Sequence, residues 1–430
     1  MLDFNPDPQI GGRVLRLVID AVNECNLRCT YCHPGEVWKR QQLPARRVAA
    51  AIEAAEAAGV LEVVLTGGEI TLHEDFGAVL DATNLLQRAA STLITNATRL
   101  TADTAEQLAR SNLTRICTSV DGVTNELHGS ARGKNLPKVL DGLRTLNGTG
   151  KPITVITVVH QRNWERVVEL SYFLAEHGLA SQHHLCAPSF SGQARAHYPE
   201  LRLREHEFHG VQEIVDTNHR DLAAAGLYLT FNSFWPATGL TPLAVNPSRT
   251  MTLQQLSEQV KDTLCNIRPS GEFRLQAATW GREMVGNAAL GSVSDAPVAD
   301  LLSRAEAILA EGSARQMPRE VEARHKFQLG TAANSTTTDL LIGRTDTPEP
   351  APDVDLIPIR SVNDHWILNN PIDVEAVAAQ LRSRPNDHRV VRHPSETILL
   401  FDRSRSLVTV LRATEWEQVA TAIGPEAVTA

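Results

Sequence analysis

Between about residues 15 and 187, short strand-like runs alternate six times with longer helix-like segments, and this pattern constrains the fold more than any other feature. Alternation of this kind predicts βα units around a parallel sheet. The expected strands are Leu15–Val22, Leu61–Thr66, Thr92–Thr95, Arg115–Val120, Ile153–Val159 and Ala180–Cys186. The expected helices, with apolar residues three and four apart, are Pro44–Ala58, Phe76–Ala89, Ala102–Arg110, Leu136–Leu146 and Trp164–His177.

Polar and reactive residues follow the carboxyl ends of these strands. In βα barrels the functional groups lie on the loops at that end, so residues from separate loops are expected to meet there. The first four strands are followed by three cysteines, by Gly67-Gly68-Glu69, by Asn96 and by Ser119-Val-Asp121. The sequence therefore predicts one functional rim.

The cysteines Cys25, Cys29 and Cys32 have a spacing suited to iron. Three thiolates can hold three corners of a four-iron cluster and leave the fourth iron open to another molecule. The alternative is a zinc knuckle completed by His33, although ligation by the adjacent Cys32 and His33 together is awkward. Spacing alone favours the iron-sulfur site.

The motifs taken together resemble those of the radical S-adenosylmethionine (SAM) superfamily. The resemblance is carried by the cysteine run with Tyr31 before its last cysteine, then by Thr66-Gly-Gly-Glu69, Thr95-Asn96, Ser119-Val-Asp121-Gly122 and Arg132-Gly133, in this order. It is strong over about residues 12–187 and weak over 188–310. One departure is Ile70, where the family usually has proline. Proline there only fixes the turn, so we expect a modest geometric change.

The resemblance implies a set of roles for these residues. Cys25, Cys29 and Cys32 would ligate one [4Fe-4S] cluster, and its open iron would bind SAM. Residues implied to contact SAM are Tyr31, Gly67, Gly68, Glu69, Asn96, Ser119 and Arg132. The implied chemistry is reductive cleavage of SAM to methionine and a 5′-deoxyadenosyl radical, which abstracts hydrogen from a substrate.

Residues 188–329 resemble the SPASM or twitch extension of a radical SAM subgroup, chiefly through Trp280-Gly281 and Val285-Gly286-Asn287. Auxiliary clusters there need several cysteines, and outside the first motif only Cys117, Cys186 and Cys265 remain. We therefore expect an extension without an auxiliary cluster. Redox-neutral outcomes are then favoured, with Cys186 and Cys265 as candidate hydrogen donors. Of the adjacent His183 and His184, one is expected to face the barrel interior.

The rest of the chain predicts a linker over residues 330–354, rich in Thr, Asn, Asp and Pro, and a small α+β domain over 355–430. The overall expectation is an α/β protein: a partial (β/α)6 barrel over 12–187, an α+β extension, and this accessory domain. The accessory domain carries no recognised catalytic motif. It is expected to bind a partner or carrier, to cover the barrel, or to stabilise a dimer.

Composition excludes some classes of function. The formal charge of −9 argues against a nucleic-acid-binding surface as the main activity. No apolar run approaches the length of a membrane span, and the first twenty residues do not resemble a signal peptide, so a cytoplasmic location is expected.

We therefore expect a radical SAM enzyme that acts on a small natural-product or sugar-like substrate with a redox-neutral outcome: epimerisation, elimination, rearrangement or decarboxylation. Its electron would come from a reductant protein such as flavodoxin or ferredoxin. Modification of a ribosomal peptide recognised by the last domain is one alternative. A non-catalytic iron-sulfur or zinc module is another.

Overall fold

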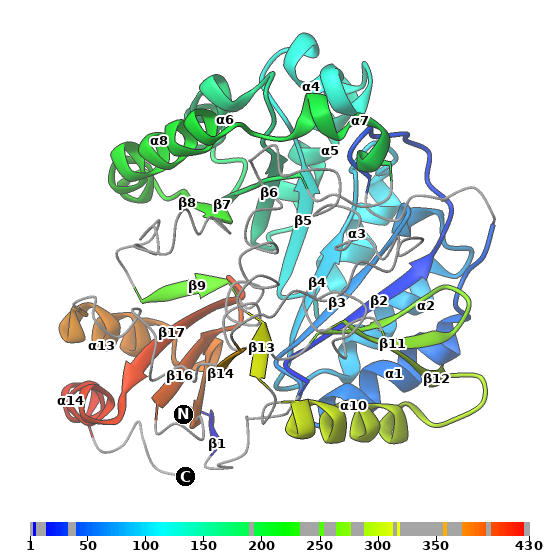
Figure 1. Cartoon of the computed structure of the whole chain (residues 1–430), viewed down its shortest axis with the longest axis vertical. Helices are drawn as coiled ribbons and strands as arrows, with labels where there is room; N and C mark the ends of the chain where they lie inside the picture. Colours follow the sequence, from blue (N-terminus) through cyan, green and yellow to red (C-terminus); the bar gives the residue numbers. More distant parts are fainter. Residues whose placement is uncertain are drawn as a thin grey trace.

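The computed structural model describes residues 3–5, 14–32, 40–188, 193–232, 249–252, 264–276, 288–312, 316–318, 356–358, 372–392 and 397–424. The statements below concern these residues. Figure 1 shows a large curved sheet with helices on its outside and a smaller sheet below it. No helix in the described ranges is long and apolar enough to cross a membrane.

The large sheet has ten strands in the order β12-β11-β10-β2-β3-β4-β5-β6-β7-β8. Its centre confirms the six expected strands: β2 (Arg16–Val22), β3 (Glu62–Gly67), β4 (Ala90–Ile94), β5 (Arg115–Ser119), β6 (Ile153–Val158) and β7 (Gln182–Cys186). Neighbouring strands in this set are parallel. On one side β8 (Tyr228–Asn232) continues the parallel sheet beyond β7.

On its other side the sheet is extended by residues 264–292. Strand β10 (Leu264–Ile267) pairs parallel with β2. Strands β11 (Glu272–Gln276) and β12 (Ala288–Ser292) follow antiparallel. Residues 280–287, on which the SPASM-like assignment rests, lie outside the described residues, so that assignment stays a prediction. The barrel and the expected extension nevertheless share one continuous sheet.

Helices pack on the outer face of this sheet. They are α1 (Ala45–Ala57), α2 (Phe76–Asp81), α3 (Ala102–Arg110), α5 (Leu136–Asn147), α6 (Val167–Glu176), α8 (Glu205–Ala224) and α10 (Val298–Gly312). Two further helices, α4 (Asn125–Arg132) and α7 (Ala194–Leu201), contribute none of their described residues to the core on that face. The expected helix over 76–89 ends early and continues as a 3₁₀ turn (Ala82–Leu85). There the Thr83 hydroxyl donates to the Leu80 carbonyl at 2.6 Å and competes with helical bonding. Helix α4, which was not predicted, begins at an N-cap in which the Thr124 side chain accepts from Leu127 N.

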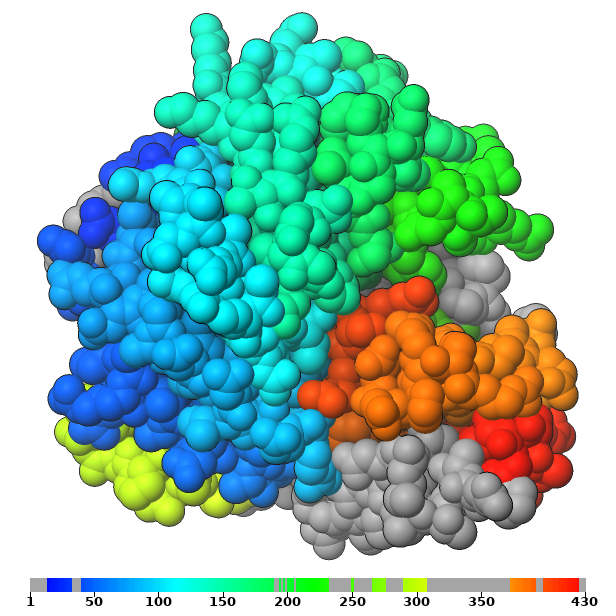
Figure 2. All heavy atoms as spheres, turned by 180° about the vertical axis from the view of Figure 1, so that it is seen from behind, coloured from blue at the N-terminus to red at the C-terminus, as the bar shows by residue number. Residues whose placement is uncertain are grey.

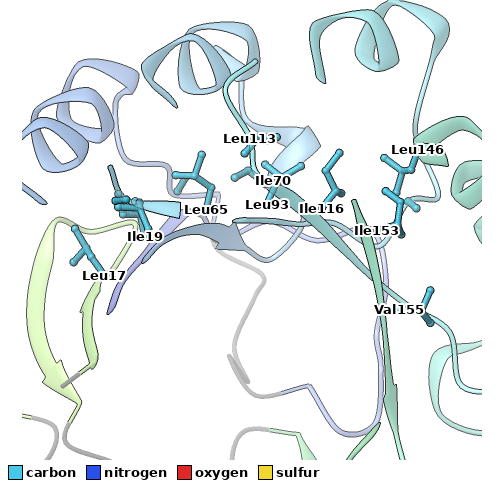
Figure 3. Packing of buried hydrophobic residues seen from close by; sticks show 14 of the residues in the cluster. Leu17, Ile19, Leu65, Ile70, Leu93, Leu113, Ile116, Leu146, Ile153 and Val155 are labelled. Carbon is cyan, nitrogen blue, oxygen red and sulfur yellow. The ribbon is translucent and has the colours of Figure 1, made fainter. Parts of the chain in front are cut away.

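Side chains alternate between the outer and inner faces of the strands. In β2, Leu17 and Ile19 are completely buried in the core under the helices, where Figure 3 shows them beside Leu65. The alternate residues Val18 and Asp20 face the barrel interior and keep partial exposure. The interior is thus less tightly filled than the outer core.

The smaller sheet has the order β1-β15-β16-β17-β9, formed by β1 (Asp3–Asn5), β15 (His388–Arg392), β16 (Thr397–Asp402), β17 (Leu407–Arg412) and β9 (Thr250–Thr252). Helices α13 (Val374–Ser383) and α14 (Ala413–Ile423) pack on it. A separate two-stranded sheet joins β13 (Gln316–Pro318) to β14 (Leu356–Pro358). The expected boundary at residue 355 therefore divides the small sheet, because two of its strands come from earlier segments. The expected linker, 330–354, lies outside the described residues.

The small sheet and its two helices, hereafter the C-terminal module, contact the amino-terminal end of the barrel strands. Arg115, the first residue of β5, donates to the Arg405 carbonyl at 2.9 Å, and Arg403 donates to the Ala89 carbonyl at 3.1 Å. Figure 2 shows orange and orange-red atoms of the module directly against the cyan atoms of the barrel. The module therefore covers the end of the barrel opposite to the cysteines.

Candidate active site

The three cysteines lie on the loop that follows β2. The backbone of this loop is anchored at several points: Cys32 N donates to the Cys29 carbonyl at 3.1 Å, and Thr30 N donates to the Ala131 carbonyl at 2.9 Å. Among the described residues no three His, Cys, Asp or Glu side chains converge tightly enough to hold one metal ion. A four-iron cluster takes one thiolate per iron and does not require that convergence. His33, the possible zinc ligand, lies outside the described residues.

The glycine pair shapes the base of the cysteine loop. A Cβ atom on Gly67 would lie 2.2 Å from the Val22 carbonyl oxygen, and one on Gly68 would lie 2.3 Å from the Glu24 carbonyl oxygen. The same backbones are hydrogen bonded, with Gly68 N to Val22 O at 2.7 Å and Glu69 N to Glu24 O at 2.8 Å. We expected these glycines to admit a ligand. What the structure shows is that they admit the backbone leading to Cys25.

Glu69 is buried, and both oxygens of its carboxylate accept hydrogen bonds from the protein. One oxygen accepts hydrogen bonds from the Thr71 and Thr95 hydroxyls at 2.8 and 2.6 Å, and the other accepts from Asn96 N at 2.6 Å. These hydrogen bonds give Glu69 a positioning role, and its implied contact with SAM stays a prediction. Glu69 joins the loops that follow β3 and β4.

Asn96 lies against the cysteine loop, as the rim pattern predicts. Its amide donates to Asn26 Oδ1 at 2.8 Å and lies 3.9 Å from the Cys25 sulfur. The next residue, Ala97, has a positive φ of 59°, which is uncommon for alanine. The Ala97 carbonyl packs against Gly142 of helix α5. A Cβ atom on Gly142 would lie 1.9 Å from the Ala97 carbonyl oxygen, so only glycine leaves room for it. The turn that presents Asn96 is thus fixed by packing.

Tyr31, Asp121 and Arg132 form a buried network beside the cysteines. The Tyr31 hydroxyl donates to Asp121 at 2.6 Å and accepts from Arg132 Nη1 at 2.7 Å. The Arg132 guanidinium also lies 5.9 Å from the Tyr31 ring centre. Its Nε is buried and has no hydrogen-bond partner among the residues that the structure describes. Arg132 therefore retains a donor for a further group, as an anionic ligand requires.

Charges in this network shift several pKa values. Burial raises the pKa of Asp121 to about 6, although Arg132 and the Tyr31 hydroxyl act in the opposite direction. Burial also raises the pKa of the Cys25 and Cys29 thiols, and in both cases the Arg132 charge opposes that rise. The guanidinium is thus the local positive charge that favours anions at this end of the barrel.

Ser119 and Cys186 end β5 and β7 on the inner face, close to the same rim. Both are half-buried. The Cys186 thiol donates to the Thr157 carbonyl at 3.6 Å. Burial, together with the Asp121 charge, raises its pKa to about 12, so at neutral pH the sulfur carries its hydrogen. The assignment of Cys186 as a hydrogen donor stays a prediction.

The structure contradicts the same prediction for Cys265. This residue lies in β10 in register with Leu17 of β2, and both belong to the apolar core on the outer, helix-covered face of the sheet. Burial raises the pKa of its thiol, with the Glu306 charge of α10 acting in the same direction. Its side chain therefore points away from the barrel interior. The sequence could not show this because the partner of β10 is remote in the chain.

The two adjacent histidines separate as expected. His183 is buried on the outer face and bonded to Ser171 and Thr157 at 2.8 Å each. His184 faces the interior and its Nδ1 lies 2.8 Å from the Thr230 hydroxyl. Burial lowers the pKa of His184 to about 4. It is therefore a neutral group in the barrel wall at physiological pH.

Comparison with known proteins agrees with this geometry. Residues 20–174 match the family model of the radical SAM superfamily. The chain is 29% identical over 154 residues to GTP 3′,8-cyclase of Clostridium acetobutylicum, covering 35% of this chain and 48% of that protein. It is 32% identical over 154 residues to the probable GTP 3′,8-cyclase of Methanocella arvoryzae, covering 35% and 49%. The chain thus spans about half the length of the curated relatives it matches.

Solved structures show the same fold over a larger part of the chain. SuiB of Streptococcus suis bound to the precursor peptide SuiA aligns with a TM-score of 0.53 and 20% identity, over 68% of this chain and 65% of that one. SuiB bound to S-adenosylmethionine aligns with a TM-score of 0.50 and 22% identity, over 61% and 60%. At these identities the likeness concerns the fold.

Proposed function

Residues 20–174 form a domain of the radical SAM superfamily, and from this premise we propose that the protein is an enzyme that uses one [4Fe-4S] cluster and SAM to abstract hydrogen from its substrate. Cys25, Cys29 and Cys32 would hold the cluster. The observation that carries the proposal is the buried Arg132 guanidinium beside these cysteines, with its Nε unpartnered. This is the donor that the carboxylate of SAM would require.

The chain's own residues have separate tasks in this proposal. Glu69 and Asn96 fix the loops around the cysteines, and the Tyr31–Asp121 hydrogen bond orients the ring next to them. Ser119 contributes a hydroxyl at the end of β5. When bound, the cluster and SAM supply a 5′-deoxyadenosyl radical able to remove hydrogen from an unactivated carbon. The surrounding barrel positions that carbon and limits access of water.

We further propose a redox-neutral outcome on a small natural-product or sugar-like molecule. The inward Cys186, protonated at neutral pH, can return a hydrogen atom to a substrate carbon, as an epimerisation requires. Elimination, rearrangement and decarboxylation are the other redox-neutral outcomes. A reductant protein such as flavodoxin or ferredoxin would deliver the electron, which suits a cytoplasmic location.

Anaerobic reconstitution tests the core of this proposal. About four irons per chain and dithionite-dependent release of 5′-deoxyadenosine are expected, and both should be lost when the three cysteines are replaced by alanine. Bound zinc with no cleavage of SAM would instead indicate the non-catalytic metal-binding module.

Modification of a ribosomal peptide is the second candidate. It is favoured by the shared fold with SuiB, whose structure holds the precursor peptide SuiA. The contacts of the C-terminal module at the opposite end of the barrel weigh against the module presenting a peptide to the rim. Synthetic peptides labelled with deuterium distinguish the candidates, since transfer of the label into 5′-deoxyadenosine would identify a peptide substrate.

A further inference from the structure

Two polar residues on neighbouring strands meet on the inner face of the barrel below the cysteine loop. Asp20 of β2 is in register with Thr66, directly before the glycine pair. Asn266 of β10 is in register with Val18, and its amide nitrogen donates to Asp20 Oδ2 at 3.1 Å. Leu17 and Ile19 occupy the opposite face under the helices, as Figure 3 shows. The Asp20–Asn266 pair therefore belongs to the interior.

Asn266 has an unsatisfied acceptor at this position. The residue is only 3% exposed, and its Oδ1 has no hydrogen-bond partner within the described part of the chain. The orientation of the amide is determined by its neighbours, because Nδ2 faces two acceptors, Asp20 Oδ2 and the Val18 carbonyl. A flipped amide would direct its oxygen at both of them. A buried acceptor without a partner costs about 1–3 kcal/mol, which a ligand donor could recover.

The negative charge of Asp20 is balanced by the positive charge of Arg268. Arg268, which follows β10, lies 3.6 Å from Asp20 Oδ2, and the two side chains are 29% and 17% exposed. The Asp20 side chain is thus mostly buried, with burial raising its pKa against the opposing effects of Asn266 and Arg268, and it is paired with a cation. Such a site offers two adjacent acceptors, Asp20 and Asn266, without net charge. It suits neutral hydroxyl donors better than an ammonium group.

We propose that Asp20, Asn266 and Arg268 form a substrate subsite that recognises adjacent hydroxyl groups of a sugar-like polyol. This inference rests on the proposed function and gives its substrate class a structural basis. Asp20 and Asn266 accept from neighbouring hydroxyls, and Arg268 keeps the subsite selective for uncharged ligands. A peptide backbone presents its N–H donors singly along the chain and matches this pair of acceptors less well.

The test measures binding to the full-length, iron-loaded protein in the presence of SAM, by saturation-transfer NMR with D-glucose, D-glucosamine and N-acetylalanine methylamide as probes. The wild type is expected to bind glucose best. Asn266→Leu should weaken glucose binding about tenfold, the loss of roughly one good hydrogen bond. Asn84→Leu, on an exposed position far from β10 in the chain, is the control and should bind normally.

Arg268→Gln tests ligand preference, which would not change if Arg268 only stabilised the fold. With Asp20 no longer neutralised, preference should shift about tenfold from glucose towards glucosamine. Equal glucose binding by the wild type and Asn266→Leu, or an unchanged preference in Arg268→Gln, would overturn the subsite. So would wild-type protein that binds only the amide probe, or none of the three. Release of 5′-deoxyadenosine, measured separately on each variant, shows whether the proposed enzyme activity persists when the subsite proposal fails.

Discussion

Cys186 is half-buried and Cys265 is buried, and both thiols have raised pKa values, yet they face opposite sides of the sheet. A hydrogen donor must carry its hydrogen and face the interior where a substrate would bind, and of these two only Cys186 lies on the inner face. Cys186→Ala is therefore expected to retain SAM cleavage while product formation falls at least about a hundredfold, a barrier increase of about 2.7 kcal/mol. Product analysis beside 5′-deoxyadenosine measurement checks this.

Cys265→Ala is the matched control. It leaves a small cavity in the outer core, so stability should fall by about 1–2 kcal/mol while the ratio of product to 5′-deoxyadenosine stays that of the wild type. A normal product ratio in Cys186→Ala, or a lost product in Cys265→Ala, would contradict the assignment drawn from the two faces.

Asp121 predicts a pH dependence of stability. Its folded pKa, about 6, lies above the ordinary 3.8, so between these values the folded chain keeps a proton that the unfolded chain has lost. Stability should therefore fall as pH rises through this window. Asp121→Asn cannot ionise and serves as the reference. Between pH 4 and pH 7 the free energy of unfolding of the wild type should fall by about 3 kcal/mol relative to that of this variant. Arg132, Tyr31 and Cys29 face this group and are retained in both proteins.

Urea unfolding of the wild type and Asp121→Asn at several pH values measures that difference. His128, whose pKa burial lowers to about 4, titrates in both proteins and should cancel. A difference in unfolding free energy that does not change with pH would show that the Asp121 carboxyl has an ordinary pKa.

At the scale of elements, the close approach of the β3 loop to the cysteine loop depends on glycine. Gly68→Ala would place a Cβ 2.3 Å from the Glu24 carbonyl oxygen and displace the backbone before Cys25. Reconstituted iron should fall well below the roughly four atoms per chain expected of the wild type. Gly77→Ala is the control: its Cβ would meet only the Gln107 side chain, at 3.7 Å. It should keep its iron and gain about 0.5–1 kcal/mol of stability, since Gly77 lies in α2.

The elements also show how far the sequence could predict the structure. Periodicity predicted the six central strands and the rim, because strand ends and βα order are local properties. It could not place β10 beside β2, because that contact joins Cys265 to Leu17 across about 250 residues. Two shortcomings of the sequence predictions follow from this: Cys265 is a candidate hydrogen donor by sequence although it faces the outer core, and the Asp20–Asn266 contact is not predicted. Alternation within Leu15–Val22 already separates Asp20 from Leu17, but nothing local indicates its partner.

At the scale of the molecule, the C-terminal module is joined to the rest by strands from three parts of the chain. Its sheet takes in β1 and β9, and Arg249 forms a buried ion pair with Glu415 of α14. Its turn at 402–406 meets Arg115, which together with Arg16 pairs with the buried Glu62 at the barrel floor. The module and barrel are therefore expected to unfold as one cooperative unit.

Asp402 holds the turn that makes this contact. One carboxylate oxygen accepts from Ser404 N, Ser404 Oγ and Arg405 N, and the other accepts from Arg384. Asp402→Ala removes the carboxylate that accepts these hydrogen bonds and should destabilise the whole chain by about 2–3 kcal/mol, because the remaining Arg384 is partly exposed. Asp141→Ala, which breaks an exposed ion pair with Arg144, should change stability by less than about 1 kcal/mol. Calorimetry should show a single transition at lower temperature for Asp402→Ala. A separate early transition, with the barrel unchanged, would mean that the module folds independently and that its contact with Arg115 does not stabilise the barrel.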